Sequence, residues 1–142
     1  MSTTHEQKVE KFYTHGAKDR CQQEGGFLSF GYWTKDGITY HQAVESLIEH
    51  ILASEVPQTK ARILNVACGY GAETFRIFNK IKPGSIVGID ITKSHIDYAN
   101  SQAIKNGFAH KIAFEKQDAC NLKYAGKSFN YIIGIEGPAH FN

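Results

Sequence analysis

"RILNVACGYGAETFRIF" (residues 62–78) joins an apolar segment, a turn with glycines at positions 69 and 71, and a segment with helical periodicity. Glycine lets the backbone take positive φ and lets a ligand lie directly against it. The first N–H groups of the following helix are unpaired and favour an anionic or carboxylate-bearing ligand. The stretch therefore predicts a ligand site at a strand-to-helix turn, although such a turn can also serve close packing alone.

The same alternation of strand and helix continues along the chain. Strands are expected at residues 62–67, 85–90, 111–116 and 129–136, and helices at 72–82 and from 92 to just before Gly107. This order predicts an α/β fold with a parallel, doubly wound sheet and right-handed crossovers. In such a sheet, ligands bind at the carboxyl ends of the strands, where the strand order reverses.

The N-terminal part has a different character. Helical segments are expected at residues 7–21 and 38–54, with Thr39 and Gln42 spaced as a capping box. A loop rich in glycine and aromatic residues lies between them. We expect one structural domain, composed of an N-terminal helical cap (1–56) and a core (57–142).

Composition limits the classes of function. The 42% apolar and 21% charged fractions are those of an ordinary soluble protein, and a net charge of +2 is too small to favour nucleic acid or a membrane surface as partner. The three cysteines are widely spaced without CxxC, as in a reduced, cytoplasmic protein. The N-terminus is polar, without a signal peptide. The histidines lack metal-binding spacing, so no metal is expected.

An acidic residue ends the second predicted strand. Asp90 in "IVGID" lies nineteen positions after Gly71 (90 − 71), where a carboxylate can accept hydrogen bonds from both hydroxyls of a ribose. The alternative is that Asp90 only caps the helix that begins near Thr92. We favour ribose binding.

Two nucleoside cofactors fit this arrangement, a nicotinamide dinucleotide and S-adenosylmethionine. The dinucleotide fingerprint requires a third glycine where this chain has Thr74, and bulk there would obstruct close packing of helix and strand. After the third strand, Asp118 in "QDACNL" could accept a hydrogen bond from an adenine amino group. The balance favours S-adenosylmethionine.

Several motifs, in this order, resemble class I S-adenosylmethionine-dependent methyltransferases. They are "LNVACGYG" (64–71), "VGIDIT" (87–92), "QDA" (117–119) and "FNYIIGIEGPAHF" (129–141). Upstream, "FLSFGYW" (27–33) is similar to the small-molecule branch, which includes sterol, tocopherol and sugar methyltransferases. The resemblance implies a Rossmann-like fold with N-terminal helices and a partial parallel sheet in the order 3-2-1-4.

The resemblance also implies roles for individual residues. Gly69 and Gly71 would lie under the methionine part of the cofactor, and the Ala67 carbonyl near its amino group. Asp90 and the adjacent Ile91 would contact the ribose. Asp118 would face the adenine, and Ala119 would donate a backbone N–H to it. Tyr32 and Trp33 would close over the cofactor, with Tyr13 as a further candidate, or would simply cover the end of the sheet.

Two positions depart from the family pattern. The family usually has an acidic residue where this chain has Asn65, which can still hydrogen-bond to the cofactor but removes a negative charge near its ammonium and sulfonium. It usually has glycine where this chain has Ala67, and alanine is tolerable there if φ is negative.

The fourth motif carries the candidate catalytic residues. Methyl transfer requires alignment of the acceptor, and a base only where the acceptor must lose a proton. His140 is suited to deprotonate a hydroxyl, or is a hydrogen-bonded loop histidine. Glu136 is expected to bind the amino group of the cofactor or to orient the acceptor. "EGPAHF" departs from the pattern of enzymes that methylate nucleic-acid amines, so a small-molecule acceptor is expected.

The family fold has seven strands, and this sequence provides four. We interpret it as truncated after the fourth motif, which leaves "YIIGI" at an apolar sheet edge and predicts self-association there. The favoured function is a methyltransferase module. The alternatives are a non-catalytic cofactor-binding or interaction protein and, less favoured, an NAD-dependent oxidoreductase.

Overall fold

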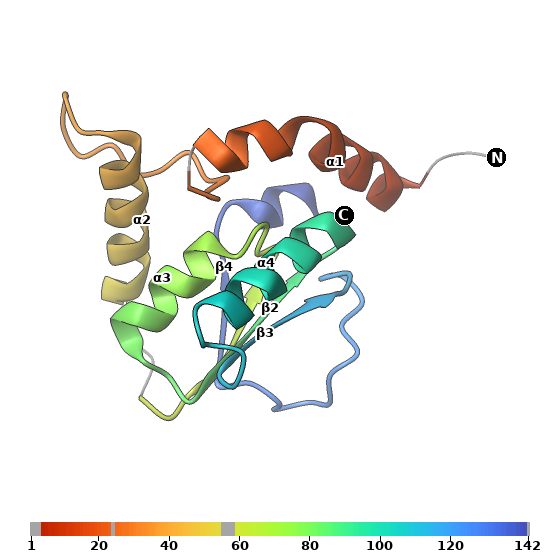
Figure 1. Ribbon diagram of the computed structural model, residues 1–142. Coiled ribbons are helices and arrows are strands. Elements are labelled where there is room, and N and C mark those ends of the chain that lie inside the picture. The colour runs from red at the N-terminus through yellow and green to blue at the C-terminus, as the bar shows by residue number, and fades with distance from the viewer. Residues whose placement is uncertain (1–3, 24, 55–58, 142) are drawn as a thin grey trace.

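The computed structural model describes residues 4–23, 25–54 and 59–141 (Figure 1). Its elements are α1 (His5–Gln23), α2 (Tyr40–Ser54), β1 (Arg62–Val66), α3 (Ala72–Ile81), β2 (Ser85–Asp90), α4 (Lys93–Lys105), β3 (Ile112–Lys116), β4 (Tyr131–Gly134) and the 3₁₀ helix η1 (Gly137–His140). Every helix and strand expected from the sequence is present, in the expected order. The expected boundary between cap and core lies within residues 55–58, outside the described residues.

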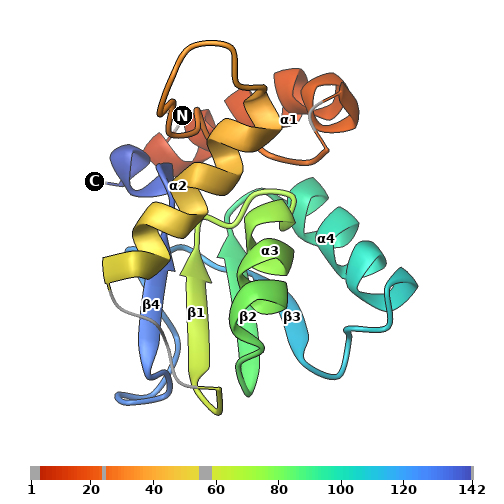
Figure 2. The same cartoon turned by 90° about the vertical axis from the view of Figure 1, so that its left-hand side faces the viewer.

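The sheet has the predicted topology. Its four strands run parallel in the order β3-β2-β1-β4 (Figure 2). The register pairs Leu64 of β1 with Val87 of β2 on one side and with Ile132 of β4 on the other. Because β1 has neighbours reached by crossovers in opposite directions, the strand order reverses there, and its carboxyl end is the expected place for a ligand.

Helices α2, α3 and α4 lie on one face of the sheet (Figure 2). Side chains alternate between the faces of a strand, so Ile63 of β1 points to these helices and Leu64 points away. Ile63 packs with Ile48 of α2 and Ile77 of α3 in the larger buried cluster. The start of α2 is fixed by the expected capping box: Thr39 N–H donates to Gln42 Oε1 (2.8 Å), and Gln42 N–H donates to Thr39 Oγ1 (3.3 Å).

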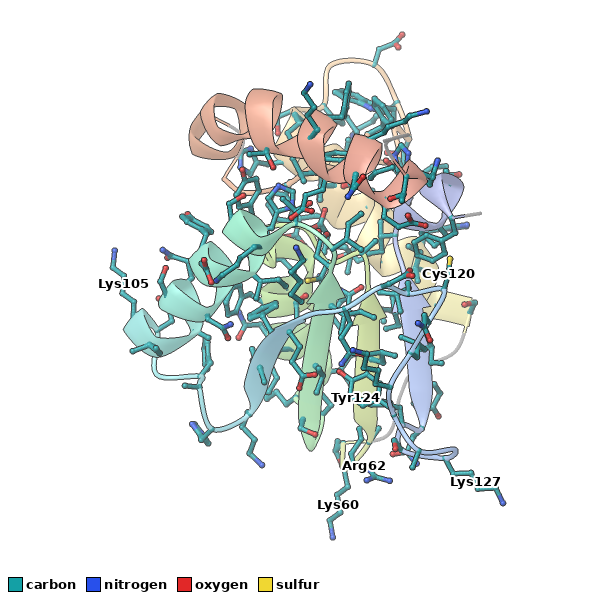
Figure 3. All side chains as sticks on the ribbon, turned by 90° about the vertical axis from the view of Figure 1, so that its right-hand side faces the viewer. Lys60, Arg62, Lys105, Cys120, Tyr124 and Lys127 are labelled. Atoms are coloured by element: carbon teal, nitrogen blue, oxygen red, sulfur yellow. The ribbon has the colours of Figure 1, made fainter. Side chains whose placement is uncertain are left out.

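The second face of the sheet is covered differently. Among the described residues, the segment 117–130 crosses it, and Ala119, Tyr124 and Phe129 pack on the buried side chains of β1 and β2 (Figure 3). Ile132 of β4 also points to this side and is 64% exposed. Within the described part of the chain, β4 pairs with β1 alone and is an edge strand.

Helix α1 lies across the carboxyl ends of the strands (Figure 1). Lys116 at the end of β3 forms an ion pair with Glu10 of α1 (2.8 Å). Near the other sheet edge, His5 Nε2 donates a hydrogen bond to the carbonyl oxygen of His140 (2.8 Å). These contacts connect α1 to the region of each edge strand of the sheet, β3 and β4. None of the helices in the described ranges is both long and apolar enough to cross a membrane.

Candidate functional site

A cavity of about 700 Å³ lies beneath α1 at the carboxyl ends of the strands. Its walls come from α1, from residues 28–30, from the β1–α3 turn, and from the segments that follow β2, β3 and β4. These segments are far apart in sequence and meet here because parallel strands end at the same edge of a sheet. The volume is that of an ordinary small-molecule site.

Asp90 connects two parts of the cavity floor. Its Oδ2 accepts a hydrogen bond from Gly69 N–H (2.9 Å), and its Oδ1 accepts one from Thr92 N–H (2.8 Å). Asp90 thus fixes the backbone of Thr92, the N-cap residue of α4, which is close to the capping role considered as its alternative. Each carboxylate oxygen can accept a second hydrogen bond, and the side chain is 12% exposed, so ribose binding remains compatible with this role.

A buried histidine accompanies Asp90. His95 Nδ1 lies 3.5 Å from Asp90 Oδ1, too distant for a well-formed hydrogen bond, and neither ring nitrogen has a hydrogen-bond partner among the described residues. Burial by itself would raise the pKa of Asp90, but His95 and the two N–H groups outweigh it and lower that pKa below its ordinary value. Asp90 is thus held as a carboxylate, and His95 retains unused hydrogen-bonding capacity at the cavity wall.

The two glycines of the turn have different surroundings. Both have positive φ, as the turn requires. Gly69 lines the cavity, and the side chain of Leu28 lies over it: a Cβ at position 69 would come within 3.0 Å of Leu28 Cδ1. Gly71 is not among the cavity residues, since a Cβ there would meet the ring of Phe114 at 2.7 Å. Gly71 thus allows close packing of the turn on β3, and its expected position under the methionine part of a cofactor stays a prediction.

Ala67 has φ of 53°, so the condition under which alanine would be easily tolerated is not met. Its side chain is accommodated by Gly137, because a Cβ at position 137 would collide with the Cβ of Ala67. Both residues line the cavity.

Asn65 lies at the buried end of the cavity. Its Nδ2 donates a hydrogen bond to Thr74 Oγ1 (2.8 Å), and both side chains are almost fully buried. This contact explains a polar residue at position 74, where a dinucleotide fingerprint would have glycine. It also engages the amide nitrogen of Asn65 within the protein.

Glu73, which sequence reasoning missed, lines the same part of the cavity and is only 8% exposed. Burial raises its pKa, opposed in part by its own backbone N–H and by polar groups of Leu28 and Ser29. A signal for it exists in the sequence. Glu73 precedes the buried residues Ile77 and Ile81 by four and eight positions, so helical periodicity places it on the buried face of α3. His95 has the same relation to Ala99 and Ala103 of α4.

Tyr32 and Trp33 are not among the residues that line the cavity, so their expected closure over a cofactor stays a prediction. Gly31 adopts positive φ against Ala43, and Tyr32 N–H donates to the carbonyl of Ala43 (2.8 Å), so the chain turns onto α2. Tyr32 stacks on His50 of α2, and Trp33 Nε1 donates to the carbonyl of Phe30. The side chains are 46% and 55% exposed. Tyr13 of α1, the further candidate, does line the cavity.

The fourth motif contributes both of its candidate residues to the cavity. Glu136 Oε2 accepts a hydrogen bond from Phe30 N–H (2.8 Å). His140 Nε2 and Tyr13 Oη are hydrogen-bonded (2.8 Å), with their rings in edge contact. Glu136 itself has φ of 57°, which ends β4 early and turns the chain into η1. This turn explains why the strand stops at Gly134 instead of residue 136.

The predicted adenine-side residues also line the cavity. Asp118 and Ala119 follow β3, and Asp118 Oδ1 accepts a hydrogen bond from Cys120 N–H (2.8 Å). Ile91 lines the cavity beside Asp90. Of the residues expected at a cofactor site, the structure thus brings together Asn65, Ala67, Gly69, Asp90, Ile91, Asp118, Ala119 and Glu136, with His140 beside them.

Comparison with known proteins identifies the class. A family model described as a methyltransferase domain matches residues 57–141, and this chain belongs to that family. It is 25% identical over 118 residues to erythromycin 3''-O-methyltransferase of Saccharopolyspora erythraea, covering 83% of this chain and 39% of that protein. It is 27% identical over 133 residues to 27-O-demethylrifamycin SV methyltransferase of Amycolatopsis mediterranei, covering 94% and 48%.

Solved structures agree on the fold. The [4+2]-cyclase SpnF superposes with a TM-score of 0.82 at 26% identity, covering 91% of this chain and 48% of that one. A geranyl diphosphate methyltransferase in complex with GPP and sinefungin superposes with a TM-score of 0.78 at 12% identity, covering 92% of this chain and 55% of that one. The Rossmann-like methyltransferase fold predicted from the motifs is confirmed. This chain spans less than half the length of the curated relatives described above.

Proposed function

We propose that this chain is the cofactor-binding part of an S-adenosylmethionine-dependent methyltransferase that acts on a small-molecule acceptor. The observation that carries the proposal is the charge of the cavity. Five acidic side chains line it (Glu6, Glu73, Asp90, Asp118 and Glu136), and no lysine or arginine does so within the described residues. Such a site suits a ligand with net positive charge and disfavours the pyrophosphate of a nicotinamide dinucleotide.

The residues fit the cofactor in further respects. His95 and Ser29 have buried polar atoms without hydrogen-bond partners among the described residues, as expected where a polar ligand completes the site. Asp90 and Ile91 would hold the ribose, and Asp118 and Ala119 the adenine. When bound, S-adenosylmethionine supplies an electrophilic methyl group.

The chain's own contribution to the chemistry would come from the fourth motif. His140 would accept a proton from an acceptor hydroxyl, and its ring is oriented by Tyr13 Oη at 2.8 Å. Glu136 would help to place the acceptor while it connects β4 to the segment 28–30. Helix α1 would exclude water from this end of the cavity.

Titration calorimetry tests the cofactor assignment. We expect the chain to bind S-adenosylmethionine and S-adenosylhomocysteine and not NAD. Binding of NAD alone, or of none of the three, would contradict the proposal.

A second candidate function is cofactor binding without methyl transfer. It is favoured by the similarity to SpnF, whose structure is described as that of a [4+2]-cyclase, and by the engagement of His140 Nε2 with Tyr13. Incubation with isotope-labelled S-adenosylmethionine and a metabolite mixture separates the two. Labelled product supports methyl transfer, and tight binding without any product supports the alternative.

A further inference from the structure

The five acidic residues around the cavity differ in their burial. Asp90 accepts two backbone N–H groups, and Asp118 and Glu136 accept one each. Glu6 lies in the exposed first turn of α1. Glu73 differs from these four in being buried, at 8% exposed, with its own backbone N–H and polar groups of Leu28 and Ser29 around it.

Glu73 lies at the part of the cavity that contains the glycine turn. Burial, followed by the negative charges of Asp90 and Glu73, raises the pKa of the Cys68 thiol, so both carboxyl groups are close to the residue that precedes Gly69. The neighbour of Glu73, Thr74, is hydrogen-bonded to Asn65. Glu73 of α3 and Asn65 of β1 both line the cavity.

A hydroxyl without a hydrogen-bond partner among the described residues lies beside this carboxyl. Ser29 is buried and lines the cavity, and its hydroxyl is close enough to lower the pKa of Glu73. The contact nevertheless lacks hydrogen-bond geometry, and Ser29 Oγ has no partner among the described residues. A buried carboxyl next to a buried, unpartnered hydroxyl is costly unless a ligand completes the arrangement.

We infer that Glu73 is the counter-charge for the positively charged methionine end of the cofactor, with Ser29 Oγ completing the polar contact. The inference rests on the proposed function and adds the residue that supplies the anion. Position 65 is neutral in this chain, and its amide nitrogen is bonded to Thr74. The negative charge at this end of the cavity thus comes from α3 and not from β1.

Titration calorimetry with two probes tests the assignment. S-adenosylmethionine carries the ammonium and the sulfonium, and 5'-methylthioadenosine keeps the nucleoside but has neither. Glu73→Gln is expected to weaken binding of S-adenosylmethionine at least about tenfold, the size expected for a lost charge-assisted hydrogen bond. Binding of 5'-methylthioadenosine should change less than about twofold, since it makes no such contact.

Three further variants define the interpretation. Glu73→Asp keeps the charge and should retain affinity within about threefold of wild type. Glu49→Gln removes the same charge from an exposed residue of α2 outside the cavity and should have almost no effect. Adding Asn65→Asp to Glu73→Gln returns a carboxyl to this end of the cavity and should recover much of the lost affinity.

The outcomes separate this inference from the proposed function. Equal losses for both probes in Glu73→Gln, or no loss for either, would overturn the role of Glu73 while wild-type binding still supported the function. A Glu73→Asp variant as weak as Glu73→Gln would also overturn it. Failure of the wild-type chain to bind S-adenosylmethionine would contradict both the proposed function and the role of Glu73.

Discussion

Ala67 carries a side chain in a backbone conformation that favours glycine. A left-handed conformation costs a non-glycine residue roughly 1–2 kcal/mol, and glycine costs more entropy on folding, which offsets part of the gain from relieving this strain. Ala67→Gly is therefore expected to raise the free energy of unfolding by about 0.5–1 kcal/mol, measured by urea denaturation. Ala53→Gly in the exposed part of α2 is the matched control and should lower it by about 0.5–1 kcal/mol. Equal losses in both variants would contradict the role of φ at position 67.

Glu73 predicts a pH dependence of stability. Its pKa is raised above the ordinary 4.5, so the folded protein binds this proton more tightly than the unfolded chain. The contribution of the protonated Glu73 to stability is fully present below pH 4.5 and is lost as the pH rises through the folded-state pKa. Glutamine has no proton to lose, so Glu73→Gln should gain stability relative to wild type between pH 4.5 and neutrality. Urea denaturation across this range measures the difference, and a constant difference would contradict the prediction.

The pKa of Asp90 is shifted in the opposite direction to that of Glu73, so its effect on stability has the opposite pH dependence. Its lowered pKa means that its contribution to stability is present above the ordinary value of 3.8 and is lost as the pH falls through the folded-state value. At neutral pH, Asp90→Ala leaves the N–H groups of Gly69 and Thr92 without their acceptor, so the free energy of unfolding should fall by about 1–3 kcal/mol. Asp97→Ala, which breaks only an exposed ion pair with Lys93, should cost less than about 1 kcal/mol. Loss of cofactor binding in Asp90→Ala must therefore be compared with its stability.

The residues of the site were only partly predictable. Gly69, Asp90 and Asp118 could be predicted because each lies at or just after the carboxyl end of a strand in a parallel sheet, and such ends share one edge. The position of Tyr32 and Trp33 outside the cavity lining was not predictable, because the positive φ of Gly31, which turns the chain onto α2, has no specific signature in sequence. Glu73 and His95 were missed, although their spacing to buried residues of α3 and α4 places both on buried helix faces.

At the scale of elements, the sequence predicted every α-helix and strand but not the 3₁₀ helix η1, and local conformation set the ends of the elements. β4 ends at Gly134 because Glu136 takes positive φ, which is unusual for a glutamate and has no signature in the sequence. The orientation of α1 was likewise not predictable. It depends on contacts between residues more than one hundred positions apart, such as Tyr13 with His140.

Helix α1 is held over the cavity by polar contacts that can be removed without changing the core. The double variant Tyr13→Phe with Glu10→Gln loses the hydrogen bond to His140 and the ion pair with Lys116. We expect α1 to be cleaved several-fold faster in limited proteolysis, because local opening costs less free energy. Thr14→Ala, whose hydroxyl bonds only within α1 to the carbonyl of Glu10, is the control. Unchanged cleavage in the double variant would mean that apolar contacts hold the helix.

At the scale of the whole molecule, the two faces of the sheet are unequally covered. Three helices cover one face, and the segment 117–130 covers part of the other among the described residues (Figure 3). The exposed side chain of Ile132 lies on this second face, on an edge strand whose outer backbone groups have no partner strand in the described part. Such an edge is prone to pair with another chain.

Self-association through β4 therefore remains a prediction. Ile132→Lys should lower the apparent mass of the chain in concentration-dependent light scattering, because a charge on an edge strand opposes pairing. Ile104→Lys is a matched control, since Ile104 is 71% exposed but lies on α4. A wild-type chain that stays monomeric at high concentration would contradict the prediction.

The contact between Ala67 and Gly137 limits the order in which these positions can change. A methyl group fits at one of them at a time, so a sequence with alanine at 137 is reachable only after position 67 has become glycine. Substitutions at these two positions, seventy residues apart in sequence (137 − 67), are therefore expected to be non-additive. Libraries that vary the fourth motif in this background will lose most variants at 137 unless position 67 is changed first.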